Sequence, residues 1–150
     1  MVAWSKFEAS DPAMADAGRR LFHRTATGEA LLATVRDDAP PRIHPINVAI
    51  VDGRLVAFLL PSQKLTDVAR DGRFALHAHQ DPAAPDEFSV RGRATIVDDP
   101  AERAAAAAVW SFEVDETYTL VEFSIDHAIL GRRGADEWPP RYTSWKPAGA

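Results

Sequence analysis

Residues 42–64 read RIHPINVAIVDGRLVAFLLPSQK, and two apolar runs in this stretch flank the dipeptide Asp52-Gly53. Both runs are rich in residues that favour β-strands, and residues 43–48 alternate between two faces. Asp-Gly favours a two-residue type I′ turn, because both of its central positions take a positive φ. The stretch therefore predicts a tight antiparallel hairpin.

The segments around this hairpin alternate between helix and strand signals. The apolar period becomes helical over residues 65–69, with Ser62 placed as the N-cap and Gly72 as the stop. Asp11-Pro12 opens an earlier helix, which Gly28 closes. A further helix is expected from Asp99-Pro100 to residue 108, and further strands at residues 30–35, 73–79, 88–97 (with Gly92 as a candidate bulge) and 118–125. Some six strands joined partly by a tight hairpin favour an antiparallel sheet that closes into a barrel.

Composition bounds the kind of protein. The 150 residues are 46% hydrophobic and 26% charged, which predicts one globular domain over 1–150, with an N-terminal helical segment at 1–28 and a Pro/Trp-rich tail at 132–150. The lack of cysteine excludes disulfides and thiolate chemistry, and a net charge of −5 argues against nucleic-acid binding. No apolar run reaches the roughly 18 residues of a membrane span, and the first residues do not look like a signal peptide. We therefore expect a cytoplasmic protein that does not enter a membrane.

Lys64 is one of only three lysines, and it follows the predicted hairpin at the start of a helix. Unpaired N–H groups at a helix N-terminus attract anions, to which Ser62 would add a hydroxyl donor and Lys64 a full charge. Taken alone, the same residues also describe an ordinary helix cap beside a solvated lysine. Spacing does not separate a phosphate site from such a cap.

Two pairs of side chains share strand faces. Arg42 could pair with a phosphate while His44 bonds to or packs on a ring, or the two residues could simply occupy a turn edge and the barrel surface. His77 and His79 also lie two residues apart, but no third ligand follows at a useful spacing. We therefore expect no metal site.

The ordered set of elements resembles the pyridoxamine 5′-phosphate oxidase-like family of FMN-binding split barrels. The resemblance covers roughly residues 20–125 and lies in the segments 33–35, 41–46, 52–53, 58–64, 65–70, 71–76 and 90–94. It implies a mainly β fold, a six-stranded antiparallel split β-barrel with short flanking helices, and a homodimer that holds the cofactor in its interface.

Carried over to this sequence, the resemblance implies a set of cofactor-binding residues. The strand along the flavin ring and ribityl chain would supply Arg42, His44, Pro45, Ile46 and Asn47, with Leu60 from the next strand. The phosphate would be held by Ser62, Gln63 and Lys64, and Glu87 would reach the cofactor from the second subunit. Gln63 stands where the full oxidases usually carry arginine, so this site has one charge fewer. The basic substrate motif of the vitamin B6 oxidases is not visible either.

Three functions fit these observations. The first is an oxidoreductase that uses FMN or the deazaflavin coenzyme F-420 on a small molecule, in which the cofactor carries the hydride and no protein nucleophile is needed. The second is a non-catalytic flavin or haem carrier or sensor on the same fold. The third is an interaction domain whose site has been lost. The aromatic residues of the tail are expected to fill core or interface, or to form a flap over the barrel mouth.

Overall fold

The structure, a computed structural model, describes residues 1–24, 28–36, 38–134 and 136–149. Its strands are β1 (Gly28–Thr34), β2 (Arg42–Val51), β3 (Arg54–Leu59), β4 (Arg73–Ala78), β5 (Glu87–Ile96), β6 (Thr119–Arg132) and β7 (Arg141–Trp145). Its helices are α1 (Trp4–Ser10), α2 (Pro12–Phe22), α3 (Gln63–Arg70) and α4 (Pro100–Ala108). Among these helices, none is long and apolar enough to cross a membrane.

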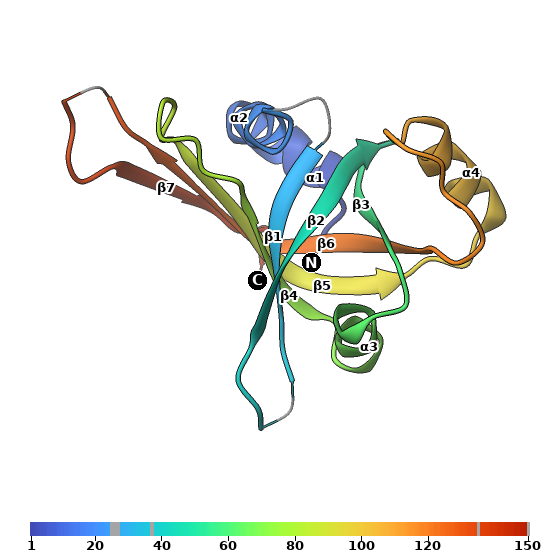
Figure 1. The fold of residues 1–150 in the computed structure, drawn as a ribbon. Helices are drawn as coiled ribbons and strands as arrows, with labels where there is room; N and C mark the ends of the chain where they lie inside the picture. Colours follow the sequence, from blue (N-terminus) through green and yellow to red (C-terminus); the bar gives the residue numbers. More distant parts are fainter. Residues whose placement is uncertain (25–27, 37, 135, 150) are drawn as a thin grey trace.

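The strands form one antiparallel sheet that closes on itself. Their order is β3-β2-β1-β4-β5-β6-β7, and an additional pairing of β3 with β6 makes a barrel of six strands. Figure 1 shows α1 and α2 on one side of this barrel, α3 on the opposite side, and β7 with the last part of β6 extending away as an arm. The predicted six-stranded antiparallel barrel with short flanking helices is thus confirmed, and β7 is an addition to it.

The hairpin that decides the fold has the predicted turn. Val51 pairs with Arg54, and the residues between them, Asp52 and Gly53, have φ angles of 48° and 74°. The Gly53 carbonyl also accepts a hydrogen bond from the Ser5 N–H at 2.7 Å, so the turn anchors the start of α1. The local turn chemistry and the position of the first helix are therefore linked.

Aromatic side chains fill the barrel end that α1 and α2 cover. Trp4 and Phe7 of α1 are fully buried, with ring centroids 5.2 Å apart in an edge-to-face arrangement. Phe22 of α2 meets Phe88 of β5 at 5.4 Å, again edge to face. This burial explains why α1 forms although its N-cap, Ala3, offers no side-chain hydrogen bond.

Several local predictions hold and two are wrong. Asp11 and Asp99 cap their helices by accepting from the N–H groups of Met14 and Glu102, and the strand register shifts at Gly92 as expected for a bulge. Gly28 does not end the first helical segment, because it lies in β1 opposite Val48, whose carbonyl a Cβ would meet at 2.1 Å. The second error concerns the tail, which was expected to be ordered by its aromatic residues alone, whereas residues 141–145 form strand β7.

The tail is regular because β6 continues to Arg132 and offers an edge to β7. Trp145 then packs on Phe7 at 4.8 Å and donates its indole N–H to the Ser10 hydroxyl. Trp138 and Tyr142, by contrast, are largely exposed. One of the three tail aromatics therefore belongs to the core, as the sequence allowed.

Replacing Gly53 with alanine tests the turn. The new Cβ would lie 2.7 Å from the Ser5 Cβ at a φ of +74°, so G53A should lower the free energy of unfolding by at least about 1–2 kcal/mol. G134A serves as the control, since its Cβ would meet only the flexible end of Glu137, and should cost less than about 0.5 kcal/mol. Urea unfolding of both variants measures the difference. Equal losses would contradict the proposed role of this turn.

Candidate functional site

The five predicted residues of β2 divide between its two faces. Arg42, His44 and Ile46 are partly or fully buried on the inward face, whereas Pro45 and Asn47 point to the opposite face. Pro45 is exposed, and Asn47 donates from its side chain to the Gly28 carbonyl at 3.4 Å. A cofactor that lies on one face of this strand can therefore contact the side chains of that face, but not those of the other face.

The chain leaves β3 at Leu59 and starts α3 at Gln63, which places the predicted phosphate residues in one short connection. Ser62 occupies the N-cap position, but its hydroxyl donates to the Leu60 carbonyl at 2.9 Å and makes no bond to the helix. Ser62, as the N-cap, therefore satisfies none of the first-turn N–H groups of α3 with its side chain. Leu60 and Gln63 are both exposed.

Lys64 lies half-buried in the first turn of α3, beside the inward face of β2. Among the described residues, no carboxylate comes within ion-pair distance of its ammonium group. Burial lowers the pKa of His44, and the positive charges of Lys64 and Arg42 lower that pKa further, which places all three groups within electrostatic reach of one another. The structure thus brings together Arg42, His44 and Lys64 as the sequence predicts.

Asp67 is the component of this cluster that sequence reasoning missed. Its carboxylate is only 4% exposed, accepts a hydrogen bond from the Thr34 hydroxyl at 2.9 Å, and pairs with Arg42 at 3.4 Å. The Arg70 guanidinium lies 3.9 Å from its other oxygen. Asp67 therefore neutralises Arg42 and leaves Lys64 as the uncompensated charge. The one sequence signal was an acidic residue beside the apolar Val68 on a short helix.

One buried nitrogen in the cluster has no partner. His44 Nε2 is shielded from solvent and makes no hydrogen bond to a described residue. Buried polar atoms are normally satisfied, so an orphaned one at a suspected binding site indicates a missing partner. The cluster of Lys64, Arg42, His44 and Asp67, together with the start of α3, is called the α3 site below.

Glu87 does not join the α3 site within one chain. It begins β5, and its two carboxylate oxygens accept from Gln80 and from the Tyr142 hydroxyl, each at 3.0 Å. The Glu87 carboxylate raises the pKa of Tyr142. A contact between Glu87 and a cofactor from a second subunit stays a prediction.

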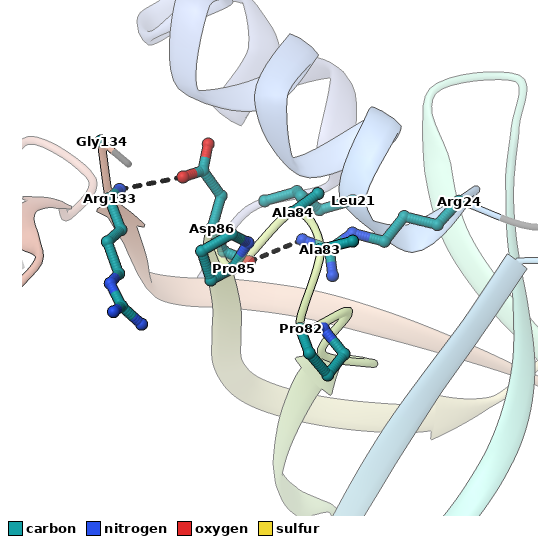
Figure 2. Close-up of a pocket in the computed structure, with 9 residues that line it drawn as sticks. All are labelled: Leu21, Arg24, Pro82, Ala83, Ala84, Pro85, Asp86, Arg133 and Gly134. Carbon is teal, nitrogen blue, oxygen red and sulfur yellow. Dashed lines mark hydrogen bonds between the residues drawn. The ribbon is translucent and has the colours of Figure 1, made fainter. Parts of the chain in front are cut away.

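The histidines at 77 and 79 do not form part of a metal cluster in the described chain, where no three His, Asp or Glu side chains group suitably. His77 Nδ1 lies 2.6 Å from the Ala78 carbonyl, whereas His79 Nε2 is buried without a partner. A pocket of about 560 Å³ lies elsewhere, between the end of α2, the loop before β5 and the end of β6 (Figure 2).

Solved structures with the same fold are numerous. A NimC/NimA family protein from Clostridium acetobutylicum matches with a TM-score of 0.66 at 15% identity, over 88% of this chain and 93% of that one. A protein related to general stress protein 26, of the pyridoxinephosphate oxidase family and also from Clostridium acetobutylicum, matches with a TM-score of 0.62 at 14% identity, over 95% of each chain. At these identities the matches show the fold alone, which is the split barrel of pyridoxamine 5′-phosphate oxidase-like proteins.

A haem-binding protein from Mycobacterium smegmatis has the same fold, with a TM-score of 0.62 at 16% identity over 87% of this chain. The chain spans only 57% of the length of that protein. No family model matches the sequence, and no curated protein does. The split-barrel fold is thus shared with a haem-binding protein.

The pH dependence of stability tests the environment of His44. Because its pKa is lowered in the folded state, acidification below about pH 6.5 protonates this histidine first in the unfolded chain and so favours unfolding. Between pH 7 and pH 5, wild type should lose more unfolding free energy than H44Q, which lacks the titrating group. Urea unfolding at several pH values in this interval gives the comparison. Parallel curves would mean that neither burial nor the neighbouring cations lower the pKa of His44.

Proposed function

We propose that the chain is an oxidoreductase that binds a phosphate-bearing flavin, FMN or the deazaflavin coenzyme F-420, at the α3 site. The observation that carries the proposal is the half-buried Lys64, which has no described counterion and stands at a helix start without a side-chain cap. Charges that are partly removed from water are normally paired, and a phosphate would supply the missing partner.

The residues present fit such a group. Lys64, the N–H groups of the first turn of α3 and Gln63 would hold the phosphate, with Ser62 beside them. His44 Nε2, which has no partner, could bond to the phosphate or ribityl end. Arg42 contributes less than the sequence suggests, because Asp67 already neutralises it at 3.4 Å. The site therefore carries one effective positive charge, which favours a single phosphate.

The proposed flavin supplies hydride transfer, and the protein's part is orientation and exclusion of water. Pro45 and Asn47 on the outward face of β2, with Leu60, would lie along the ring, whereas Ile46 on the inward face would support the strand beneath it. Glu87 of a second copy would approach the ring. Lys64 would fix the phosphate end and thereby the position of the ring relative to β2. With the flavin transferring the hydride and the protein orienting it, no acid or base is needed among the described residues of the site.

A second copy of the chain is part of this proposal. The outward face of the sheet carries a cross-strand row of apolar side chains, with Pro45 paired to Leu31 and Ile43 paired to Ala33. Ile43 is 69% exposed and Leu31 is 37% exposed. Covering these residues with the same face of another copy would bury them and would bring cofactor contacts from two chains together.

A haem carrier is the second candidate function. His44 Nε2 is unpartnered and could serve as a ligand, and one structural neighbour is a haem-binding protein. The absorption spectrum and mass of the molecule that copurifies with the protein distinguish the two: flavin or deazaflavin bands support the oxidoreductase, and a haem band supports the carrier. A bound flavin that neither nicotinamide cofactors nor reduced deazaflavin can reduce would also favour the carrier.

Titration of K64A with FMN and with riboflavin tests the phosphate site. Loss of a charge-assisted hydrogen bond should weaken FMN binding by about 1.5–3 kcal/mol, whereas riboflavin, which has no phosphate, should bind both proteins equally. K6A, at an exposed lysine of α1, is the matched control and should leave FMN binding unchanged. Equal FMN affinity in K64A and wild type, measured by flavin fluorescence, would remove the basis of the proposal.

The oligomeric state of I43E tests the sheet face. A charge placed in the apolar row should convert a dimer to a monomer, because it would be buried against its own copy in the partner. V109E, at a residue that is 62% exposed after α4, should sediment like wild type. Sedimentation velocity measures both. A monomeric wild type, or an I43E variant that stays dimeric, would contradict an interface at this face.

A further inference from the structure

The pocket near the end of α2 has properties that the flavin proposal does not use. Its volume is about 560 Å³, within the range of small-molecule sites, and it lies across the barrel from α3 (Figures 1 and 2). Its lining comes from three separate parts of the chain: Leu21 and Arg24 at the end of α2, Pro82–Asp86 before β5, and Arg133 and Gly134 after β6.

The wall formed by residues 82–86 is held in place by hydrogen bonds. Arg24 donates to the carbonyl of His79 at 2.9 Å and to that of Asp86 at 2.6 Å, so it spans the two ends of the loop. The Asp86 carboxylate accepts from the Arg133 N–H at 2.9 Å, and Figure 2 shows this carboxylate turned toward Arg133 and away from Arg24. The pocket is thus preformed around a fixed guanidinium.

Neither arginine of the pocket has a carboxylate partner among the described residues. Arg24 is half-buried and bonds only to backbone carbonyls, which leaves several of its five N–H donors without a described acceptor. The Arg133 guanidinium lies over the Trp138 ring at 5.1 Å and donates to the Glu137 carbonyl. With Asp86 as the one acid in the lining, the pocket has a surplus of one positive charge, in a protein whose net charge is −5.

The remaining lining is apolar. Leu21 faces the loop residues Pro82, Ala83, Ala84 and Pro85, which expose ring and methyl groups and no charge. A rigid guanidinium with free donors matches a planar carboxylate in two parallel hydrogen bonds. A ligand suited to this pocket has one carboxylate and a compact apolar body.

We propose that this pocket binds a small organic monocarboxylate, with Arg24 as the primary anchor and Arg133 as the second cation. The carboxylate balances the surplus positive charge of the described lining, and the apolar body packs on Leu21 and the Pro82–Pro85 wall. This site is separate from the α3 site and does not depend on a flavin being bound.

Calorimetric titration with 3-phenylpropionate tests the proposal, and 3-phenylpropionamide is the uncharged control ligand. Wild type should bind the acid and bind the amide at least about 10-fold more weakly, since a charge-assisted bond is lost. R133Q should weaken binding of the acid by several fold. R20Q, at an exposed arginine of α2 that pairs with Asp16, should not change it.

Arg24 needs a paired substitution because it also holds the loop. R24K keeps the charge but not the planar fork. It should bind the acid up to about 10-fold more weakly than wild type does, and should keep its melting temperature. R24Q removes the charge as well as the fork. If R24Q does not fold, the test of the proposal rests on R24K and R133Q. Equal affinity for acid and amide, no binding of the acid up to about 10 mM in wild type, or unchanged affinity in both R24K and R133Q would overturn the proposal. FMN affinity is measured in parallel and should be the same in all these proteins.

Discussion

The pairing of β3 with β6 is the constraint on which the rest of the structure depends. Residues Leu55–Leu59 of β3 are all buried, and the strand is hydrogen-bonded on both edges, to β2 through the hairpin and to β6 across the closure. Closure removes the exposed edges that an open sheet of this length would have. It also fixes the point at which the chain leaves β3, and therefore where α3 starts and which side of the barrel receives Lys64.

The charges of the α3 site follow from this placement. Closure of the barrel places α3 beside β1 and β2. Asp67 is buried there, with Thr34 and Arg42 as its partners. A buried carboxylate with two partners of this kind holds three elements in register. Since Asp67 is committed to Arg42, the positive charge that remains available belongs to Lys64. Lys64, on which the proposed phosphate site depends, is thus the charge of this cluster that the described contacts of the fold do not use.

Local sequence signals predicted the fold well and the site in part. The Asp52-Gly53 turn, the caps at Asp11 and Asp99 and the bulge at Gly92 act within a few residues, so they are visible in the sequence and are confirmed. Helix α1 was predicted only as part of a helical segment over 1–28, and strand β7 was not predicted, because both owe their order to distant partners, as when Trp145 packs on Phe7.

The same contrast applies within the α3 site. The placing of Arg42, His44 and Lys64 in one site was predicted from the resemblance to a known family, while the residues alone left a surface reading open for each. The role of Asp67 could not be predicted, since Thr34 and Arg42 lie 33 and 25 positions away along the chain. Pairings over such separations leave no periodic trace in a single sequence.

The two ends of the chain meet, and this has a consequence for synthesis on the ribosome. Val2 and Ile125 exchange backbone hydrogen bonds, and Trp145 joins Phe7 and Ser10 in the core. Residues 2–7 are thus synthesised well before residues 125 and 145, and their apolar side chains stay uncovered until those partners follow. Folds dominated by such long-range contacts form slowly and expose apolar surface while they do so. Helix α1, with its two fully buried aromatic residues, is therefore a segment that the nascent chain leaves unprotected over most of this interval.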